Sequence, residues 1–260
     1  MIRNALLLVT ALLLWSPHAH AWYPDAGASL STSLTSDWTL DEASSTRVDG
    51  PGTNDLTDNN TVTQAAGKVG SAAQFTAANS ESLSIADNAS ISTGDISWTL
   101  AFWFYIDSSG GDEGLMSKYD NGAGANEYLV RLTTGPQVRI DVYDGGSGIG
   151  NVTATSFGNL STATWYFVQC GHDAAANVVF VSVNGGTVDT AATSAAGADT
   201  TGTFRMGVYN AQFFNGRLDQ ASFWKKRISA QEISDLYNAG AGNSYLAAQP
   251  KSPWRVWVTE

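Results

Sequence analysis

The chain has 260 residues, of which 11% are aromatic and only 14% are charged. A composition this rich in apolar and aromatic side chains can bury a sizeable core, which excludes an intrinsically disordered chain. The formal net charge is −11, and the longest basic run is Lys225–Arg227. Nucleic-acid binding is therefore excluded as a main function, because phosphate contacts need an extended basic surface.

The first residues have the pattern of a targeting segment. Arg3 supplies a positive charge, Ala5–Trp15 is an apolar run, and Ala19–Ala21 has the small residues of a cleavage site. This pattern predicts a signal peptide over residues 1–21 and a secreted, extracellular protein, with the periplasm or a cell or virion surface as alternatives. An uncleaved anchor or a buried helix is the other interpretation. No later run is long enough to cross a membrane, and residues 22–35 predict a polar linker.

The segment Ser97–Asp107 has the strongest strand pattern in the chain. Its large apolar side chains recur at every second position, which predicts one core-facing side. Further strand-like segments, separated by turns rich in Gly and Asn, are Asp37–Glu42, Ala72–Phe75, Ser82–Ala86, Gly114–Tyr119, Glu127–Leu132, Gln137–Tyr143, Thr164–His172, Val178–Asn184 and Thr203–Val208. Short alternating strands with almost no helix predict an all-β fold, an antiparallel β-sandwich or jelly roll.

The segment Gly216–Gly240 predicts a strand followed by one short C-terminal helix. Ser229 and Glu232 have the spacing of a capping box, and Gly240 is a natural stop for the helix. Within the strand, Asp219 alternates with apolar residues, so we expect it to share their buried face. A carboxylate there needs a partner, because an unpaired buried charge is costly.

Several strands carry polar or aromatic side chains on the face that alternates with the core. Sugar recognition uses aromatic rings against the C–H faces of a sugar and planar polar groups for its hydroxyls. The predicted carbohydrate-binding residues are Trp103, Tyr105, Arg131, Arg139, Asp141 and Tyr143. A second possible site, in loops, comprises Tyr119, Asn121, Asn210 and Phe213. For Trp103 the alternative is a structural role, in a sheet buried on both sides or beneath a covering loop.

Five segments together resemble one known family. They are WTLDE with Asp49-Gly50 behind it (38–50), GKVGSAAQF with SLSI (67–85), WTLAFWFYID (98–107), TWYFV (164–168) and GRLDQASFWKKRISAQEISDLYNAG (216–240). In this order they are similar to the laminin G-like (LamG/pentraxin-type) modules of the concanavalin A-like lectin/glucanase superfamily. The resemblance covers residues 36–246, leaves 247–260 as a C-terminal tail, and implies two antiparallel sheets curved against each other.

The resemblance also implies a ligand and a metal. Many relatives bind sugars or glycoconjugates, and many hold a structural calcium ion between an early loop and an acid on the last strand. Asp219 matches that late acid, and Asp49, with carbonyl groups of the loop that follows it, is the early side. Calcium takes such oxygen ligands. The rival interpretation is a metal-free Asp219 that accepts backbone N–H groups.

The same superfamily contains glycoside hydrolases. Its glucanase branch shows Glu-x-Asp-x-x-Glu, a spacing that does not occur here, and retaining glycosidases need two carboxylates about 5–5.5 Å apart. His172 has no visible partner and is interpreted as a surface residue at a strand end. We therefore predict a non-catalytic, lectin-like module for glycans or glycoconjugates. Two alternatives stay open: a structural or adhesin protein with a cell-surface or virion partner, consistent with Trp254 and Trp257, and a hydrolase with acids from distant strands.

Overall fold

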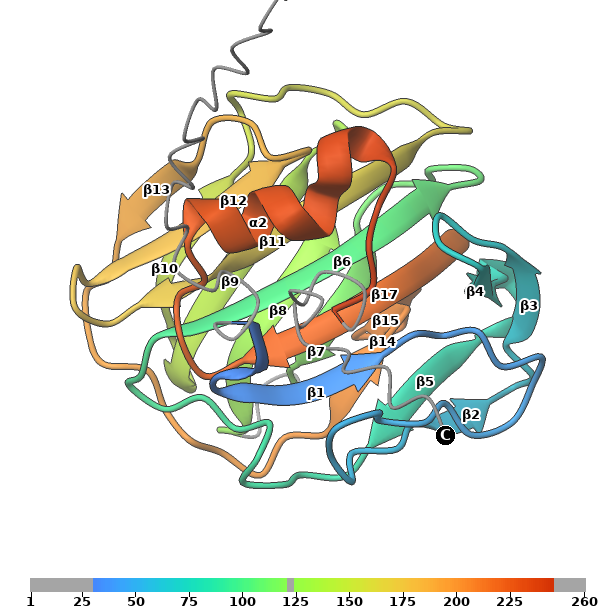
Figure 1. Cartoon of the computed structure of the whole chain (residues 1–260). Helices are drawn as coiled ribbons and strands as arrows, with labels where there is room; N and C mark the ends of the chain where they lie inside the picture. Colours follow the sequence, from blue (N-terminus) through green and yellow to red (C-terminus); the bar gives the residue numbers. More distant parts are fainter. Residues whose placement is uncertain (1–29, 121–123, 246–260) are drawn as a thin grey trace, which may run out of the picture.

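The computed structural model describes residues 30–120 and 124–245, which form a sandwich of two antiparallel sheets (Figure 1). The first sheet has eight strands in the order β13-β12-β11-β6-β17-β4-β3, with β1 paired to β17. These strands are β1 (Leu34–Trp38), β3 (Thr63–Ala66), β4 (Ser71–Phe75), β6 (Trp98–Ile106), β11 (Trp165–Asp173), β12 (Val178–Val183), β13 (Asp189–Ala192) and β17 (Gly216–Trp224). This architecture confirms the predicted all-β sandwich.

The second sheet has seven strands in the order β10-β9-β8-β7-β14-β5-β2. They are β2 (Thr57–Asn59), β5 (Ser82–Ile85), β7 (Glu113–Lys118), β8 (Asn126–Leu132), β9 (Val138–Gly145), β10 (Gly148–Thr153) and β14 (Phe204–Met206). A small hairpin pairs β15 (Val208–Tyr209) with β16 (Gln212–Phe213). The helical elements are η1 (Ala77–Asn79), α2 (Ala230–Tyr237) and η2 (Asn238–Gly240).

The main core lies between the two sheets. Strand β6 contributes the alternating set that the sequence analysis assigned to the core, and these side chains are fully buried. Trp98 crosses to the opposite sheet, where its ring lies 4.8 Å from that of Tyr128. Trp38 stacks on Phe204 at 5.4 Å in the same way. Aromatic contacts of this kind tie the sheets together.

A second, smaller core lies on the outer face of the eight-stranded sheet, beneath α2 (Figure 1). The predicted capping box forms: the Ser229 side chain accepts from the backbone of Glu232, and the Glu232 carboxylate accepts from the backbone of Ser229. Tyr237 of α2 stacks on Trp103 at 5.8 Å, and Trp103 is only 2% exposed. The eight-stranded sheet is therefore buried on both faces where α2 covers it.

The fold begins earlier than the predicted boundary at residue 36. Leu30 is fully buried in the second core, and its carbonyl accepts a hydrogen bond from Trp224 Nε1 at 2.7 Å. Residues 30–35 therefore belong to the domain rather than to a linker. The predicted signal peptide (1–21) and the tail (247–260) lie outside the described residues.

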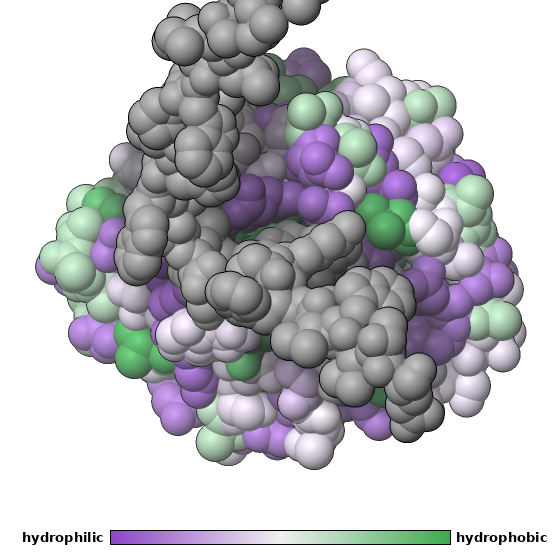
Figure 2. Space-filling view, in the orientation of Figure 1, coloured by the Kyte–Doolittle hydropathy of each residue, from purple (hydrophilic) through white to green (hydrophobic). Residues whose placement is uncertain are grey.

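The outer surface in the view of Figure 2 mixes hydrophilic and apolar residues on its described part. Large exposed apolar side chains are scattered along the described ranges, at Val48, Ile96, Phe157 and Val188. Within the same ranges, no helix has the length and apolar character needed to cross a membrane.

The second core predicts a stability role for Trp103. Trp103→Ala should lower the free energy of unfolding by about 3–5 kcal/mol, because a buried aromatic ring leaves a cavity beneath α2. Urea denaturation followed by circular dichroism measures this. Phe157→Ala is the matched control: its side chain is 41% exposed, so a loss below about 1 kcal/mol is expected. Equal stability of the two variants would contradict the buried role of Trp103.

Candidate functional site

The β15–β16 hairpin lies on the outer face of the seven-stranded sheet, across β7. Gly207 N donates to Leu115 O at 2.9 Å, and Ser117 Oγ donates to Val208 O at 3.0 Å. The approach is so close that a Cβ at Gly114 would lie 2.4 Å from Tyr209 N. The hairpin therefore divides this face into two regions.

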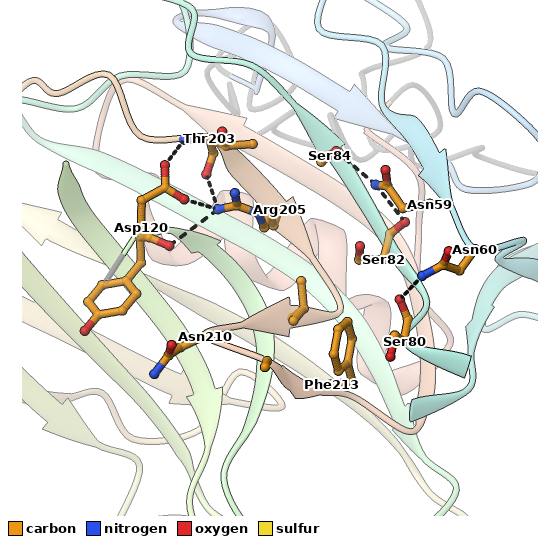
Figure 3. Close-up of a pocket in the computed structure, with 13 residues that line it drawn as sticks. Asn59, Asn60, Ser80, Ser82, Ser84, Asp120, Thr203, Arg205, Asn210 and Phe213 are labelled. Atoms are coloured by element: carbon orange, nitrogen blue, oxygen red, sulfur yellow. Dashed lines mark hydrogen bonds and ion pairs between the residues drawn. The ribbon is translucent and has the colours of Figure 1, made fainter. Parts of the chain in front are cut away.

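A polar cavity of about 590 Å³ lies on one side of the hairpin (Figure 3). Figure 3 shows Arg205 and Asp120 at one end, with Asn59 and Asn60 beside their serine partners across the cavity. Phe213 lies between these groups, at the base of the view. The cavity thus combines amide, hydroxyl, guanidinium and carboxylate groups with an aromatic ring.

Arg205 is held at the cavity by one nitrogen. Its Nη1 forms an ion pair with Asp120 and hydrogen-bonds the carbonyl groups of Tyr119 and Thr203 at 3.5 and 3.4 Å. Asp120 is fixed in turn, because its Oδ2 accepts from Thr203 N at 3.0 Å. Among the described residues Arg205 has no bond through Nε or Nη2, and its side chain is 30% exposed. Two donor atoms are therefore available to a ligand.

The opposite wall is ordered by asparagine side chains. Asn59 Nδ2 donates to Ser84 Oγ at 2.9 Å and to Ser82 O at 3.2 Å. Asn60 Nδ2 donates to Ser80 O at 2.8 Å. Each amide nitrogen is thus used within the protein, which leaves the amide oxygens available as hydrogen-bond acceptors.

The loop residues of the second predicted site partly meet here. Tyr119, Asn210 and Phe213 all line the cavity, whereas Asn121 lies outside the described residues. Tyr119 also packs against Tyr143 at 5.2 Å and Tyr209 at 6.2 Å. An aromatic group therefore connects the cavity with the region beyond the hairpin.

Four of the predicted binding residues lie in that region, on β8 and β9. Arg139 Nη2 contacts Asp141 Oδ1 at 2.6 Å, and Arg131 Nε contacts Asp141 Oδ2 at 3.3 Å. Burial raises the pKa of the Tyr143 phenol, and the negative charge of Asp141 adds to this rise. The charged groups of Arg131, Arg139 and Asp141 mostly pair with one another, so the cluster forms a closed ionic network beside the hairpin.

The other two predicted residues belong to the opposite sheet, so the six residues do not form one site. Trp103 lies on β6 beneath α2, which corrects its interpretation as an exposed platform. Tyr105 packs against Trp165 at 5.4 Å, and the guanidinium of Arg217 lies 4.5 Å from its ring centre. Alternation identified a non-core face correctly, but not which sheet it belongs to or what covers it.

Three residues of the cavity, Arg205, Asp120 and Asn59, are not among the binding residues predicted from the sequence. Arg205 alternates with the core residues Phe204 and Met206, which is a usable signal for an outward position. Asp120 and Asn59 follow or end short strands, and no sequence pattern places them at one cavity. His172 also differs from its predicted surface position: it is fully buried, with Nδ1 3.1 Å from Ile96 O.

A β-bulge changes the expected orientation of Asp219. Asp219 pairs with Trp103 and Ser222 with Ala101, so two residues of β17 oppose one residue of β6. Gln220 takes the positive φ of 48° at this point. Because a bulge adds one residue, alternation restarts and Asp219 lies on the outer face rather than on the core face of Ala221.

The two expected calcium ligands, Asp49 and Asp219, both accept hydrogen bonds from backbone amides. Asp219 Oδ2 accepts from the backbone N–H groups of Lys68 and Val69 at 2.6 and 2.9 Å. Asp49 accepts from the backbone of Asp37 and Asn54, each at 3.0 Å. No group of three or more acidic, His or Cys side chains in the described ranges could hold a metal. These oxygens hold backbone amides, as the rival interpretation expected, and calcium binding stays a prediction.

Comparisons with known proteins place this geometry in context. The family model described as "Concanavalin A-like lectin/glucanases superfamily" matches residues 76–234, more than half of the chain. A comparison with curated proteins finds no significant match.

Several solved structures share the fold. The binding domain of Paraclostridial Mosquitocidal Protein 1 aligns with a TM-score of 0.66 and 16% identity, over 80% of this chain and 52% of that one. The present chain thus spans about half the length of that structure. Domain 4 of AbnA, a GH43 extracellular arabinanase from Geobacillus stearothermophilus, aligns with a TM-score of 0.57 and 16% identity, over 81% of this chain and 98% of that domain. A botulinum neurotoxin type C structure aligns with a TM-score of 0.60 and 12% identity, over 80% and 51% of the two chains.

The buried carboxyl group of Asp219 predicts a pH-dependent stability. Burial raises its pKa from the ordinary 3.8 to about 7, although the amides of Val69 and Lys68 oppose this rise. Between these values the folded state keeps a proton that the unfolded state releases. The free energy of unfolding should therefore fall as pH rises through this window, by up to about 1.4 kcal/mol per pH unit.

The comparison of wild type with Asp219→Asn isolates this effect, because the raised pKa of Asp37, about 6, is common to both proteins. Urea denaturation from pH 4 to pH 8 should show the free energy of unfolding falling more steeply with rising pH for wild type than for Asp219→Asn; parallel curves for the two proteins would contradict the prediction. The same series with added calcium tests the metal: a bound ion would stabilise wild type above pH 7 and leave Asp219→Asn unchanged.

Proposed function

Because the chain belongs to the concanavalin A-like lectin/glucanase superfamily, we propose that it is a carbohydrate-binding module whose ligand lies in the cavity beside the β15–β16 hairpin. The single observation that carries this proposal is the cavity itself, which is about 590 Å³ in volume and joins polar groups to two aromatic side chains. Within the described lining, these aromatic residues are Tyr119 and Phe213.

The chemistry of the cavity fits a sugar. A pyranose or furanose ring presents C–H groups on its faces, which pack on aromatic rings, and hydroxyls at its edge, which need donors and acceptors. Phe213 supplies a ring, Arg205 supplies two free donors, and Asn59 and Asn60 supply acceptors. The charge of Arg205 is balanced by Asp120, so the site can take a neutral ligand without burying an unpaired charge.

Two of the structural neighbours support this class of ligand. The AbnA domain was solved in complex with arabinotriose, and the neurotoxin structure is described by an interaction with two ganglioside molecules. Both align over about four-fifths of the present chain. We extend the general class, glycans or glycoconjugates, to this chain, and we include export through the predicted signal peptide in the proposal.

The proposal is for binding without catalysis. Asp120 is the only carboxylate among the described residues that line this cavity, and it is paired with Arg205. Canonical glycoside hydrolysis uses two carboxylic groups on either side of the scissile bond. Release of reducing sugar from a bound polysaccharide would overturn this part of the proposal.

Binding should depend on Arg205 and Phe213. A glycan array identifies ligands, and isothermal titration with the strongest one measures affinity. Arg205→Gln should weaken binding by roughly tenfold to a hundredfold, since a hydrogen bond to a charged group contributes about 1.5–3 kcal/mol. Phe213→Ala should weaken it about three- to tenfold through the loss of ring stacking.

Two control variants match these changes in chemistry and exposure. Arg217→Gln also removes an arginine that pairs with one aspartate, but on the eight-stranded sheet; its side chain is 24% exposed against 30% for Arg205. Phe157→Ala removes an exposed phenylalanine elsewhere. Both controls should bind as wild type does. If Arg217→Gln lost binding and Arg205→Gln kept it, the ligand would lie beside Tyr105 instead.

A further inference from the structure

A second cavity, of about 430 Å³, lies directly beside the first. Its polar lining includes Ser108, Asp112, Glu113, Gln212 and Asn215. This second cavity lies on the other side of the hairpin, beside the first residue of β7 and the residue that precedes β17. None of these residues lines the first cavity, so the two have different polar chemistry.

The two cavities share one side chain. Phe213 lines both of them. The two residues before Phe213 divide between the cavities: Ala211, in the hairpin turn, lines the first, and Gln212 of β16 lines the second. The short helix η1 divides in the same way, with Ser80 at its end in the first cavity and Ala78 in the second. A narrow ridge of β16 and η1, with the partly exposed ring of Phe213, therefore stands between the cavities.

The ridge is firmly held. Phe214, the next residue, is fully buried, and its ring lies 6.3 Å from that of Phe75 in the main core. Phe214 N donates to Gly207 O at 2.9 Å, which closes the hairpin. Core packing thus fixes the backbone that carries Phe213, and a ligand meets this residue without ordering a loop.

The described lining of the second cavity offers an acidic ligand no cationic partner. Glu113 accepts from Gly110 N at 2.6 Å and Asn215 N at 3.3 Å, and Asp112 accepts from Arg131 Nη1 at 2.5 Å. No Lys or Arg side chain lines this cavity within the described residues. Sugar hydroxyls can donate to these carboxylates, whereas a carboxylate or sulfate group on the ligand would lose its hydration here without a cation to pair with.

We infer that the ligand is an uncharged, linear oligosaccharide chain that crosses the ridge, with one sugar unit on Phe213 and its neighbours in the two cavities. This inference rests on the proposed function and adds to it the class of glycan. An oligosaccharide binds more tightly than a single sugar unit, because a unit held in the first cavity raises the effective concentration of its neighbour at the second cavity.

The test uses linear arabino-, cello- and galacto-oligosaccharides, each from the mono- to the hexasaccharide, in isothermal titration with the full chain. Affinity should rise by at least about tenfold from disaccharide to hexasaccharide in the series that binds. Oligogalacturonides of matched length, with a carboxylate on each unit, should bind at least about tenfold more weakly than galacto-oligosaccharides.

Two matched variants separate the cavities. Ala78 and Ala211 are both exposed alanines, one in each cavity, so Ala78→Leu and Ala211→Leu add the same bulk without a hydrogen-bonding group. Ala211→Leu should weaken chains of every length, and Ala78→Leu only the longer ones. Because Ala211 has a φ of 62°, where a larger side chain adds strain, circular dichroism and urea denaturation verify that both variants keep the wild-type fold and stability.

The outcomes are distinguishable. If a disaccharide binds as tightly as a hexasaccharide, or if Ala78→Leu leaves hexasaccharide affinity unchanged, the two-cavity ligand is wrong while the proposed function stands. Tighter binding of oligogalacturonides would overturn the neutral character of the ligand. No binding by any series would instead count against the proposed function itself.

Discussion

Strand β6 is buried on both of its faces, and this determines where a ligand can bind. Its inner side chains fill the space between the sheets, and Ala101 and Trp103 on its outer face lie beneath α2. The ring of Tyr237 closes that side by stacking on Trp103. Where α2 covers this face there is no room for a ligand, and both polar cavities lie beside the β15–β16 hairpin instead.

On the seven-stranded sheet the β15–β16 hairpin forms the walls of cavities, which a flat sheet lacks. A β-sheet alone offers shallow grooves between its side chains, whereas a hairpin laid across it creates walls on two sides. Gly114 and Gly207 make this possible, because the backbones approach too closely for a side chain at Gly114, and Gly207 takes a φ of +81°. The hairpin's own side chains then serve both sides, with Phe213 at the boundary of the cavities and Tyr209 beside Arg131.

Much of the fold was predictable from the sequence, because long strands alternate and helices carry caps. The core face of β6 and the capping box of Ser229 and Glu232 are of this kind. The bulge at Gln220 was not, since nothing in the sequence marks the inserted residue, which reverses the faces of the residues before it, Leu218 and Asp219 included. The cavity was harder still: β15 and β16 are too short to show a period, and Asn59 and Arg205 meet only because β5 and β14 are neighbours in the sheet.

The place of β17 in the sheet has a consequence for how the protein folds. This strand comes last in the chain, yet it lies between β6 and β4 and also carries β1. Until it has been synthesised, β6 has an open edge with unpaired backbone groups, and β1 has no partner. The part β13-β12-β11-β6 can therefore join β4-β3 and β1 only after β17 has been synthesised, through contacts between distant segments, which form slowly. During that interval the free edge of β6 can pair with other chains.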